Sequence, residues 1–430
     1  MSTLALPVAE RAATPPPKLD IRFNENGMLV LGMAILLVAA VLWTVRGPFS
    51  EKADFTFTYL GARLVHQGDG ALLYDLSEQK SVVTSLFKHP NPLIYEHPPF
   101  EALVFAPLAA LRYRTAYLIW GIINALIWLL ALYLIRPYAP VPRNQPGYLA
   151  AWIFFAPLCV ALCEGQTSLV LLLLYILTFI NLKRGRDRVA GLCLGLGLFK
   201  FQFVLPFALI FLLRSKWRLL SGFAVSATLL GTLSLVPAGW QGVLRYLQLL
   251  VQISRHPANV SYGSAVDMPT VQGFVYAILG HKASLPALSF IVAATSVSLV
   301  LFAAWRWQQE ERKLKSDTSF DLMFAGAVAV SLVTGFHMFT HDFSPLMLAM
   351  LLVVAHLPGK ERPRLRLLLK STLVVFWIWP LYFALVAWHS LYLMFPVLAV
   401  FALTAFRLAA IPAEGFLMEG KRAPVGRLAI

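Results

Sequence analysis

Long apolar segments recur along almost the whole chain, and this repetition constrains the fold more than any other feature. A helix that crosses a bilayer needs about 20 apolar residues. Hydrophobic residues make up 59% of the 430 residues and charged residues only 13%, which leaves too little polar surface for a soluble globular enzyme. We therefore expect one polytopic, all-α membrane domain with about 12 transmembrane helices.

The apolar segments predict where these helices lie. The first span is expected at 27–45, as an uncleaved segment without the small-residue cleavage site of a signal peptide. Further spans are expected at 117–135, 149–162, 169–182, 189–199, 203–213, 219–236, 285–305, 321–335, 344–356, 371–388 and 391–406. The segments 189–199 and 203–213 are too short to cross a bilayer alone, so they must end within protein or at a water-filled cavity.

Basic residues lie in clusters between the apolar segments and predict the topology. About 25 of the 36 Lys and Arg residues would lie on one side, in both termini and in the connections 136–146, 183–188, 214–218, 306–315 and 359–370. Cytoplasmic loops are enriched in Lys and Arg, so both termini are expected inside. The other side has two long loops, 46–116 and 237–284, and the apolar stretch 98–111 must lie along or dip into the outer face. The net charge of +15 is thus a topology signal and not a nucleic-acid surface.

These boundaries predict a cytoplasmic segment at 1–26, a transmembrane domain at 27–410 and a cytoplasmic tail at 411–430. The three cysteines, Cys159, Cys163 and Cys193, lie in apolar stretches without partners at metal spacing, so neither a disulfide framework nor zinc is expected.

The outer side gathers polar residues in several runs. Ionisable groups at the outer ends of the helices are candidates for chemistry because that is where the helices open to water. The candidates are Asp54, Tyr74, His97, Gln166, Lys200, His337, His341 and Asp342. Side chains of these types can bind phosphate or move protons. Lys200, a cation on the outer side between two short apolar segments, is a candidate to bind a lipid phosphate.

Each candidate also has a structural explanation. A loop carboxylate such as Asp54 is commonly only solvated, His97 before Pro98 and Pro99 can simply end a loop, and Lys200 can be an interfacial anchor. His337 and His341 are a weak metal-ligand pair on their own, and no acidic cluster accompanies Asp54 in the sequence, so no metal is expected.

The whole arrangement resembles the GT-C superfamily of membrane glycosyltransferases and, more narrowly, glycosyltransferase family 87. The resemblance rests on short motifs: Asp54 with Tyr59-Leu-Gly-Ala-Arg, Gly68 and Leu73-Tyr74, then Pro98-Pro99 with Pro107-Leu108, Gly165-Gln166, Lys200 and His341-Asp342. It implies a GT-C-like bundle with a long first outer loop that contains short surface helices.

The resemblance also implies an activity. It is the transfer of a hexose, typically mannose, from a polyprenyl-phosphate sugar to a glycan or glycolipid acceptor at the outer face of the cytoplasmic membrane. The reaction is expected to invert the anomeric carbon, with Asp54 as base and without a metal or other cofactor. Such an inversion needs one carboxylate as base and a cation near the departing phosphate, a role that Lys200 suits with His341 or His97 as helpers. The Glu-Asp pair of some GT-C enzymes is missing, because Lys52-Ala53 precede Asp54. The other polar candidates are expected to bind substrate, with membrane lipids around the protein and no nucleic acid bound.

Two other classes fit the many spans and the basic outer residues. A transporter or flippase of a lipid-linked substrate is the main alternative, although no internal repeat with broken helices in corresponding halves is visible. An O-antigen polymerase or ligase is another, but in this chain the first outer loop is among the longest, whereas those enzymes carry their main loop late.

Overall fold

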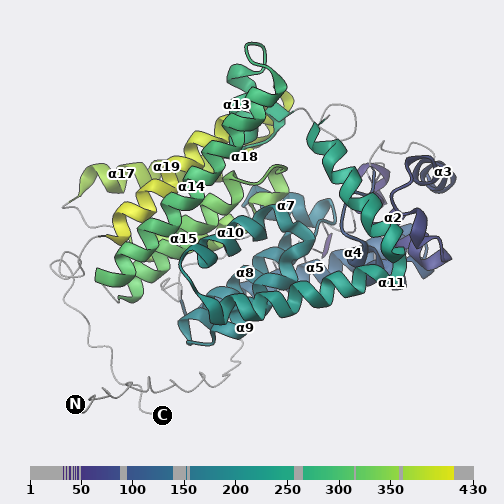
Figure 1. Cartoon of the computed structure of the whole chain (residues 1–430), viewed down its shortest axis with the longest axis horizontal. Coiled ribbons are helices and arrows are strands. Elements are labelled where there is room, and N and C mark those ends of the chain that lie inside the picture. Colours follow the sequence, from purple (N-terminus) through teal and green to yellow (C-terminus); the bar gives the residue numbers. More distant parts are fainter. Residues whose placement is uncertain are drawn as a thin grey trace, which may run out of the picture.

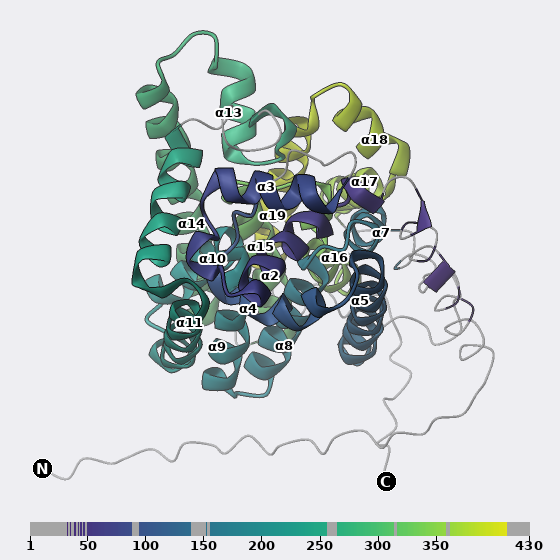
Figure 2. The same cartoon turned by 90° about the vertical axis from the view of Figure 1, so that its right-hand side faces the viewer.

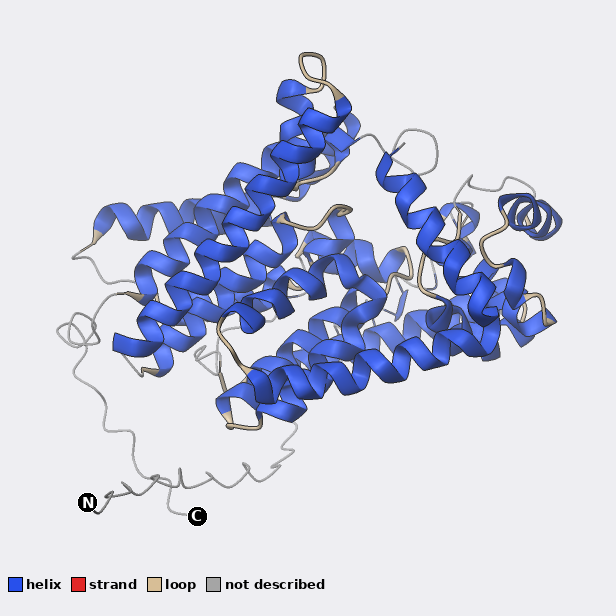
Figure 3. Ribbon diagram, in the orientation of Figure 1, coloured by secondary structure: helices blue, strands red, loops and turns tan. Residues whose placement is uncertain are grey.

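The computed structural model describes residues 50–87, 94–138, 155–255, 265–313, 316–357 and 362–410, with isolated positions between 32 and 47 and at 152. This part of the chain is helical and contains no strand (Figure 3). Its α-helices are α2 (Phe55–Gln67), α3 (Leu76–Leu86), α4 (Pro99–Phe105), α5 (Tyr113–Ile135), α7 (Ala156–Cys163), α8 (Ser168–Lys183), α9 (Asp187–Leu196), α10 (Phe201–Leu213), α11 (Trp217–Arg255), α13 (Val271–Leu279), α14 (Leu285–Lys313), α15 (Asp317–Val333), α16 (Leu346–Ala355), α17 (Pro363–Trp377), α18 (Trp379–Ala387) and α19 (Met394–Ala409). Short 3₁₀ helices join them: η1 (Ser50–Lys52), η2 (Gly70–Leu72), η3 (Ala106–Ala110), η4 (Gly197–Lys200), η5 (Ala265–Asp267), η6 (Thr340–Phe343) and η7 (Leu391–Leu393).

Several of these helices are long and apolar enough to cross a membrane. By length and composition alone, the described residues contain five such runs, Tyr113–Ile135, Asp187–Leu213, Trp217–Ile253, Leu285–Lys313 and Leu391–Ala409, and α17 with α18 would make a sixth, bent by 68°. The chain is therefore a helical, polytopic membrane protein. The expected total of about 12 spans stays a prediction, and the segments 1–26 and 411–430 and most of the first span at 27–45 lie outside the described residues.

The run Asp187–Leu213 folds back on itself at η4. A Cβ on Gly191 would stand 1.9 Å from the Leu219 carbonyl oxygen, and a Cβ on Gly222 would stand 1.9 Å from that of Arg188, so α11 begins beside the start of α9. A straight helix of that length would measure about 40 Å, which the few residues between α10 and α11 cannot bridge. Helix α10 therefore returns antiparallel to α9, and Lys200 lies at the turn, as the two short apolar segments suggested.

Helix α11 is longer than the sequence suggested. It continues through Pro237 and bends at Gly239, whose φ of 62° suits glycine. The segment 237–284, expected as an outer loop, thus begins with the second half of α11 and also contains η5 and α13. Beyond the bend, α11 packs on α4 and η2. A Cβ on Gly70 would meet the Pro237 carbonyl oxygen at 2.2 Å, so this contact requires a glycine.

The helices of the first long outer segment gather at one end of the molecule. They lie at the right of Figure 1 and face the viewer in Figure 2, where α2, α3 and α4 stand in front of the bundle. Helix α2 packs on α4 and η3. The described part of the segment 46–116 thus contains three α-helices, of which α2 is buried from Phe55 to Ala62. Their position at a membrane surface stays a prediction.

The centre of the bundle is α15. Its residues from Asp321 to Val333 are all buried, as expected for a helix that is enclosed by others on every side. It packs on α19 and α16, and a Cβ on Gly326 would stand 2.6 Å from the Phe406 ring. The loop after α15 leads into η6, so the rigid bundle centre ends directly below the outer helices.

Candidate active site

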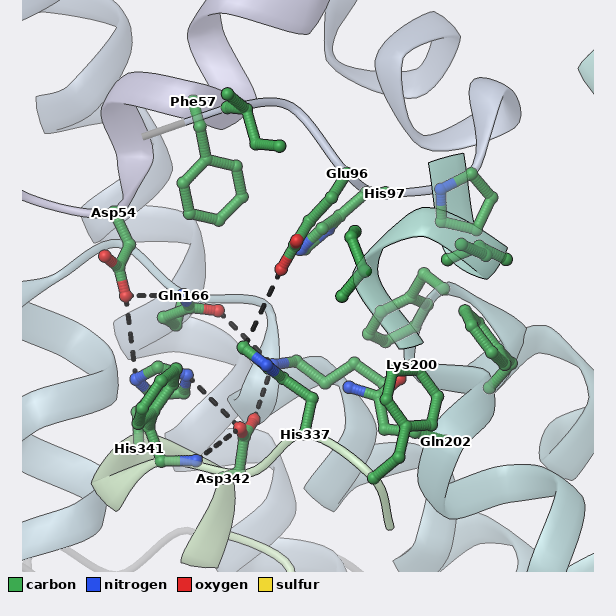
Figure 4. A pocket seen from close by; sticks show the side chains of 18 residues that line it. Asp54, Phe57, Glu96, His97, Gln166, Lys200, Gln202, His337, His341 and Asp342 are labelled. Atoms are coloured by element: carbon green, nitrogen blue, oxygen red, sulfur yellow. Dashed lines mark hydrogen bonds and ion pairs between the residues drawn. The ribbon is translucent and has the colours of Figure 1, made fainter. Parts of the chain in front are cut away.

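One pocket lies where the outer helices meet the ends of α7, α9, α10 and α15 (Figure 4). The pocket and its mouth together hold about 880 Å³ of empty space, open solvent included. One part of its lining is polar: Asp54, Glu96, His97, Gln166, Lys200, Gln202, His337, His341 and Asp342. The other part is mainly apolar: Phe57, Ile94, Pro98, Phe199, Phe201, Leu250, Ile253, Phe336 and Phe339.

Asp54 stands at the start of α2, where the backbone is tied to the bundle. The N–H of Phe55 donates to the Glu164 carbonyl oxygen at 2.9 Å, which fixes the first turn of α2 against the end of α7. Gln166 Nε2 donates to Asp54 Oδ2 at 2.7 Å, and His341 Nδ1 lies 3.6 Å from the same oxygen. Burial, and then the negative charge of Glu164, raise the pKa of Asp54 to about 7 against the opposing effects of His341 and Gln166.

The turn between α7 and α8, residues 164–167, carries Gln166 into the pocket lining and Glu164 to a position beside Asp54. Gly165 has a φ of 65°, and a Cβ there would meet the Phe55 side chain at 2.8 Å. Helix α5 holds this turn from below: Trp120 Nε1 donates to the Gly165 carbonyl oxygen at 2.7 Å, and Asn124 Nδ2 donates to that of Gln166 at 3.1 Å. The turn is therefore rigid, and its two polar side chains have defined positions.

Lys200 and Asp342 form a buried ion pair on the floor of the pocket. Lys200 Nζ lies 2.5 Å from Asp342 Oδ1, and the two side chains are 4% and 1% exposed. Asp342 also accepts from Ser168 Oγ at 3.1 Å and from the Phe339 N–H at 3.1 Å. Lys200 Nζ reaches Gln166 Oε1 at 3.3 Å, so one amide links the cation to Asp54.

His341 lies between the carboxylates of Glu164 and Asp342. Its Nδ1 lies 2.9 Å from Glu164 Oε2 and its Nε2 lies 3.4 Å from Asp342 Oδ2. Burial lowers its pKa, but Asp342 and Glu164 outweigh that effect and raise the pKa of His341 to about 10. Burial raises the pKa of Asp342, yet the charges of His341 and Lys200 hold it well below the usual range. His341 is therefore an imidazolium at neutral pH.

His97 and His337 line the opposite wall. His97 Nδ1 lies 2.6 Å from Glu101 Oε2, a carboxylate that is 3% exposed, and the His97 ring packs against Phe57. His337 Nε2 lies 3.7 Å from Glu96 Oε1, and burial lowers the pKa of His337. This wall thus offers nitrogen donors and one carboxylate to a ligand.

A metal ion has one candidate group among the described residues. Asp54, Glu164 and His341 each offer one ligand atom, and these atoms lie within 4.8 Å of one another. Both nitrogens of His341 already face carboxylates, however, which suits a protonated imidazole and not a metal ligand. We therefore describe the group as an ion-pair cluster, and independence of metal stays a prediction.

Most residues singled out from the sequence meet in this pocket. Asp54, His97, Gln166, Lys200, His337, His341 and Asp342 all line it. Tyr74 does not; it is buried behind the wall, where its hydroxyl donates to the His97 carbonyl oxygen at 2.7 Å. A direct contact of Tyr74 with substrate is therefore not supported, and its position instead fixes the backbone of His97.

Other pocket residues were not assigned from the sequence. Glu96 and Gln202 stand in the same polar runs as assigned residues, and this proximity was the signal that could have identified them. The same signal applies to Glu164, which lies beside the pocket next to Asp54 and not in its lining. The sequence also suggested no carboxylate beside Asp54, whereas Glu164 lies there. Leu250 and Ile253 were missed because their part of α11 was expected to be loop.

Comparisons with known proteins agree on one family. The model of glycosyltransferase family 87 matches residues 95–335, which include His97, Gln166 and Lys200 but not Asp54 or His341. The chain is 26% identical over 298 residues to a polyprenol-phosphate-mannose-dependent alpha-(1-2)-phosphatidylinositol pentamannoside mannosyltransferase of Mycolicibacterium smegmatis, and the match covers 68% of each chain. No solved structure matches.

Proposed function

The chain belongs to glycosyltransferase family 87 and is a membrane glycosyltransferase, and on that premise we propose the reaction that it catalyses. It transfers mannose from polyprenyl-phosphate mannose to a glycan or glycolipid acceptor, with inversion and without a metal. The pocket opens at the outer face of the cytoplasmic membrane, with both termini in the cytoplasm. The mycobacterial relative, whose printed name specifies a polyprenol-phosphate-mannose donor, supports the choice of donor.

One observation carries the proposal: a partly buried carboxylate and a buried cation line the same pocket. Asp54 and Lys200 are linked through the two ends of the Gln166 amide. A base and an anion-binding group that are joined by one amide suit a reaction at a sugar carbon. In such a reaction a hydroxyl attacks one side of the carbon and a phosphate leaves from the other.

The reaction needs each of these groups in turn. Asp54 removes the proton of the acceptor hydroxyl, the oxygen forms a bond to the anomeric carbon, and the bond to the phosphate oxygen breaks with its electron pair. The departing phosphate gains negative charge, which Lys200 stabilises with help from His97 and His337. A base with a pKa of about 7 suits this task, because it is half deprotonated at neutral pH and strong enough to take the proton.

The apolar part of the pocket supports a lipid-linked donor. Leu250 and Ile253 come from α11, and the rings of Phe201 and Phe336 pack together at a tilt of 42°, with centroids 5.6 Å apart. An isoprenoid chain would lie against these side chains with its phosphate toward Lys200, and the sugar would then point to Asp54.

The decisive experiment separates donor binding from transfer. We expect Asp54→Asn in nanodiscs to bind a short-chain polyprenyl-phosphate mannose normally, while turnover falls by roughly two to four orders of magnitude, the usual share of a general base. Asp69→Asn removes a carboxylate from the same outer segment at an exposed position outside the pocket lining and serves as the matched control. Near-normal transfer by a correctly folded Asp54→Asn protein would refute the assignment.

A cellular experiment identifies the product. Mass spectrometry of lipid-linked and envelope glycans should show the loss of one hexose when the gene is removed, and the truncated glycan then names the acceptor. An unchanged glycan profile together with altered movement of a lipid-linked substrate across the membrane would instead indicate a transporter.

A further inference from the structure

Glu164 has no role in the reaction described so far, although its carboxylate lies beside the base. It is the residue that ends α7, and its side chain is 39% exposed, whereas that of Asp54 is 23% exposed. The ligand atoms of Asp54, Glu164 and His341 all lie within 4.8 Å of one another. A carboxylate that touches the base on one side and water on the other is placed to exchange protons between them.

The fold holds Glu164 in this position from several sides. Its carbonyl oxygen accepts from the Phe55 N–H, the residue directly after Asp54, so the backbones of the two carboxylates are joined by one hydrogen bond. On the other side of Glu164, the Tyr117 hydroxyl donates to the Cys163 carbonyl oxygen and Trp120 donates to that of Gly165. This anchoring holds the backbones of the two acidic residues side by side, so their carboxylates stay within reach of each other.

His341 lies between the two carboxylates. Its Nδ1 is 2.9 Å from Glu164 Oε2 and 3.6 Å from Asp54 Oδ2. The Nδ1–H of His341 can donate to Glu164 or to Asp54. When a proton moves between these two acids, His341 can therefore donate to whichever carboxylate is ionised.

We propose that Glu164 is a positioning and proton-accepting partner of Asp54: the two carboxylates share a proton beside His341, and Glu164 passes that proton to water at its own exposed side. The inference rests on the proposed function. Asp54 takes the proton of the acceptor hydroxyl as the new C–O bond forms, and the electron pair of the broken C–O bond goes to the phosphate. The proton then moves to Glu164 and on to water, which returns Asp54 to its basic form for the next cycle.

The charges around Asp54 determine the expected pH dependence. The α7–α8 turn contributes Glu164 and the neutral Gln166, η6 contributes His341 and Asp342, and η4 contributes Lys200. Tyr113 of α5 is also near, but a phenol is uncharged at neutral pH. Glu164 is therefore the titratable anion next to Asp54 whose removal favours the deprotonated base.

The test is the pH profile of transfer by Glu164→Gln. Loss of the neighbouring negative charge lowers the pKa of Asp54, so the acid limb of kcat should move by about one unit to lower pH, as expected for a partly exposed charge at this distance. At the optimum, kcat should fall about three- to tenfold because proton release is slower, while KM for the donor stays the same. Glu164→Asp keeps the charge and should restore the original limb, whereas Asp69→Asn should leave limb and rate unchanged.

A second measurement does not depend on transfer. Infrared titration of purified protein follows the band of protonated carboxyl groups, and the part lost in Asp54→Asn belongs to Asp54. In Glu164→Gln this part should titrate about one unit lower than in the native protein. An unmoved titration and an unmoved acid limb would overturn the role of Glu164 while leaving the glycosyltransferase intact. Absence of any transfer by native protein, with the titration shifted as expected, would instead count against the proposed donor or acceptor.

Discussion

Lys200→Met tests whether the buried cation of the pocket serves both the fold and the donor. The substitution keeps most of the side-chain volume and removes the charge that lies 2.5 Å from Asp342, a carboxylate only 1% exposed. Breaking a buried ion pair by removing one partner costs about 3–5 kcal/mol. Because His341, Ser168 and the Phe339 N–H still contact Asp342, we expect the lower end of that range, about 3 kcal/mol.

Donor binding should weaken as well. A hydrogen bond to a charged group contributes about 1.5–3 kcal/mol, which corresponds to roughly 10- to 150-fold in the dissociation constant. In Lys200→Met the Asp342 carboxylate also repels the donor phosphate. The increase in the dissociation constant should therefore lie at the upper end of this range. The double variant Lys200→Met with Asp342→Asn removes this repulsion and should bind the donor about tenfold better than the single variant.

The assay combines thermal unfolding in detergent with titration of a short-chain polyprenyl-phosphate mannose in nanodiscs. Lys80→Met is the matched control, because Lys80 is an exposed lysine of α3 outside the pocket lining. Native donor affinity in a folded Lys200→Met protein would refute the phosphate role. A double variant that is less stable than the single variant would refute the reasoning about the uncovered carboxylate.

Four further outcomes are expected. In a background without the three cysteines, Lys80→Cys should react with an external thiol reagent and Arg186→Cys should not, since the 183–188 cluster is expected inside; the reverse pattern would invert the topology. Transfer should survive chelation by EDTA, and a loss that manganese or magnesium restores would make the Asp54 cluster a metal site. Burial and the charge of Glu164 raise the pKa of Asp54 to about 7. Below that pH the base is protonated, so kcat should fall about tenfold per pH unit. A kcat that stays constant down to pH 5 would contradict this. Gly222→Ala should lower the free energy of unfolding by about 1–3 kcal/mol, because the new Cβ would meet the Arg188 backbone. Gly231→Ala, in open space on the same helix, should be neutral. Equal melting temperatures of the two variants would disprove the close α9–α11 contact.

The α9–α10 turn shows how a short apolar segment can be useful to a membrane enzyme. Neither α9, with 10 residues, nor α10, with 13, is long enough to span a bilayer alone. Because the turn between them is covered by η6 and the α7–α8 turn, the lysine at that turn is held inside protein and not at the lipid surface. The cation is thereby kept inside the pocket, where the proposed donor phosphate would bind.

Local properties of the sequence were sufficient to predict that the chain lies in a lipid bilayer, that it is helical and that it resembles family 87. Apolar length and the shortage of charge are sums over neighbouring residues, so they require no knowledge of the fold. The same holds for the polar runs on the outer side, because a charged residue between apolar segments is visible without any contact. Seven of the eight candidate site residues could be identified in this way and line one pocket, with Tyr74 as the exception.

The grouping of those residues depends on tertiary structure. Lys200 and Asp342 are 142 positions apart, and Gln166 is 112 positions from Asp54, so only the packing of η4, η6 and the α7–α8 turn brings these groups together. Glu164 could be seen in the sequence but not placed beside Asp54, because that proximity depends on the hydrogen bond between Phe55 and Glu164. The pKa of Asp54 and the positive charge of His341 follow from the same contacts, since burial and neighbouring charges are properties of the assembled fold and not of the residues alone.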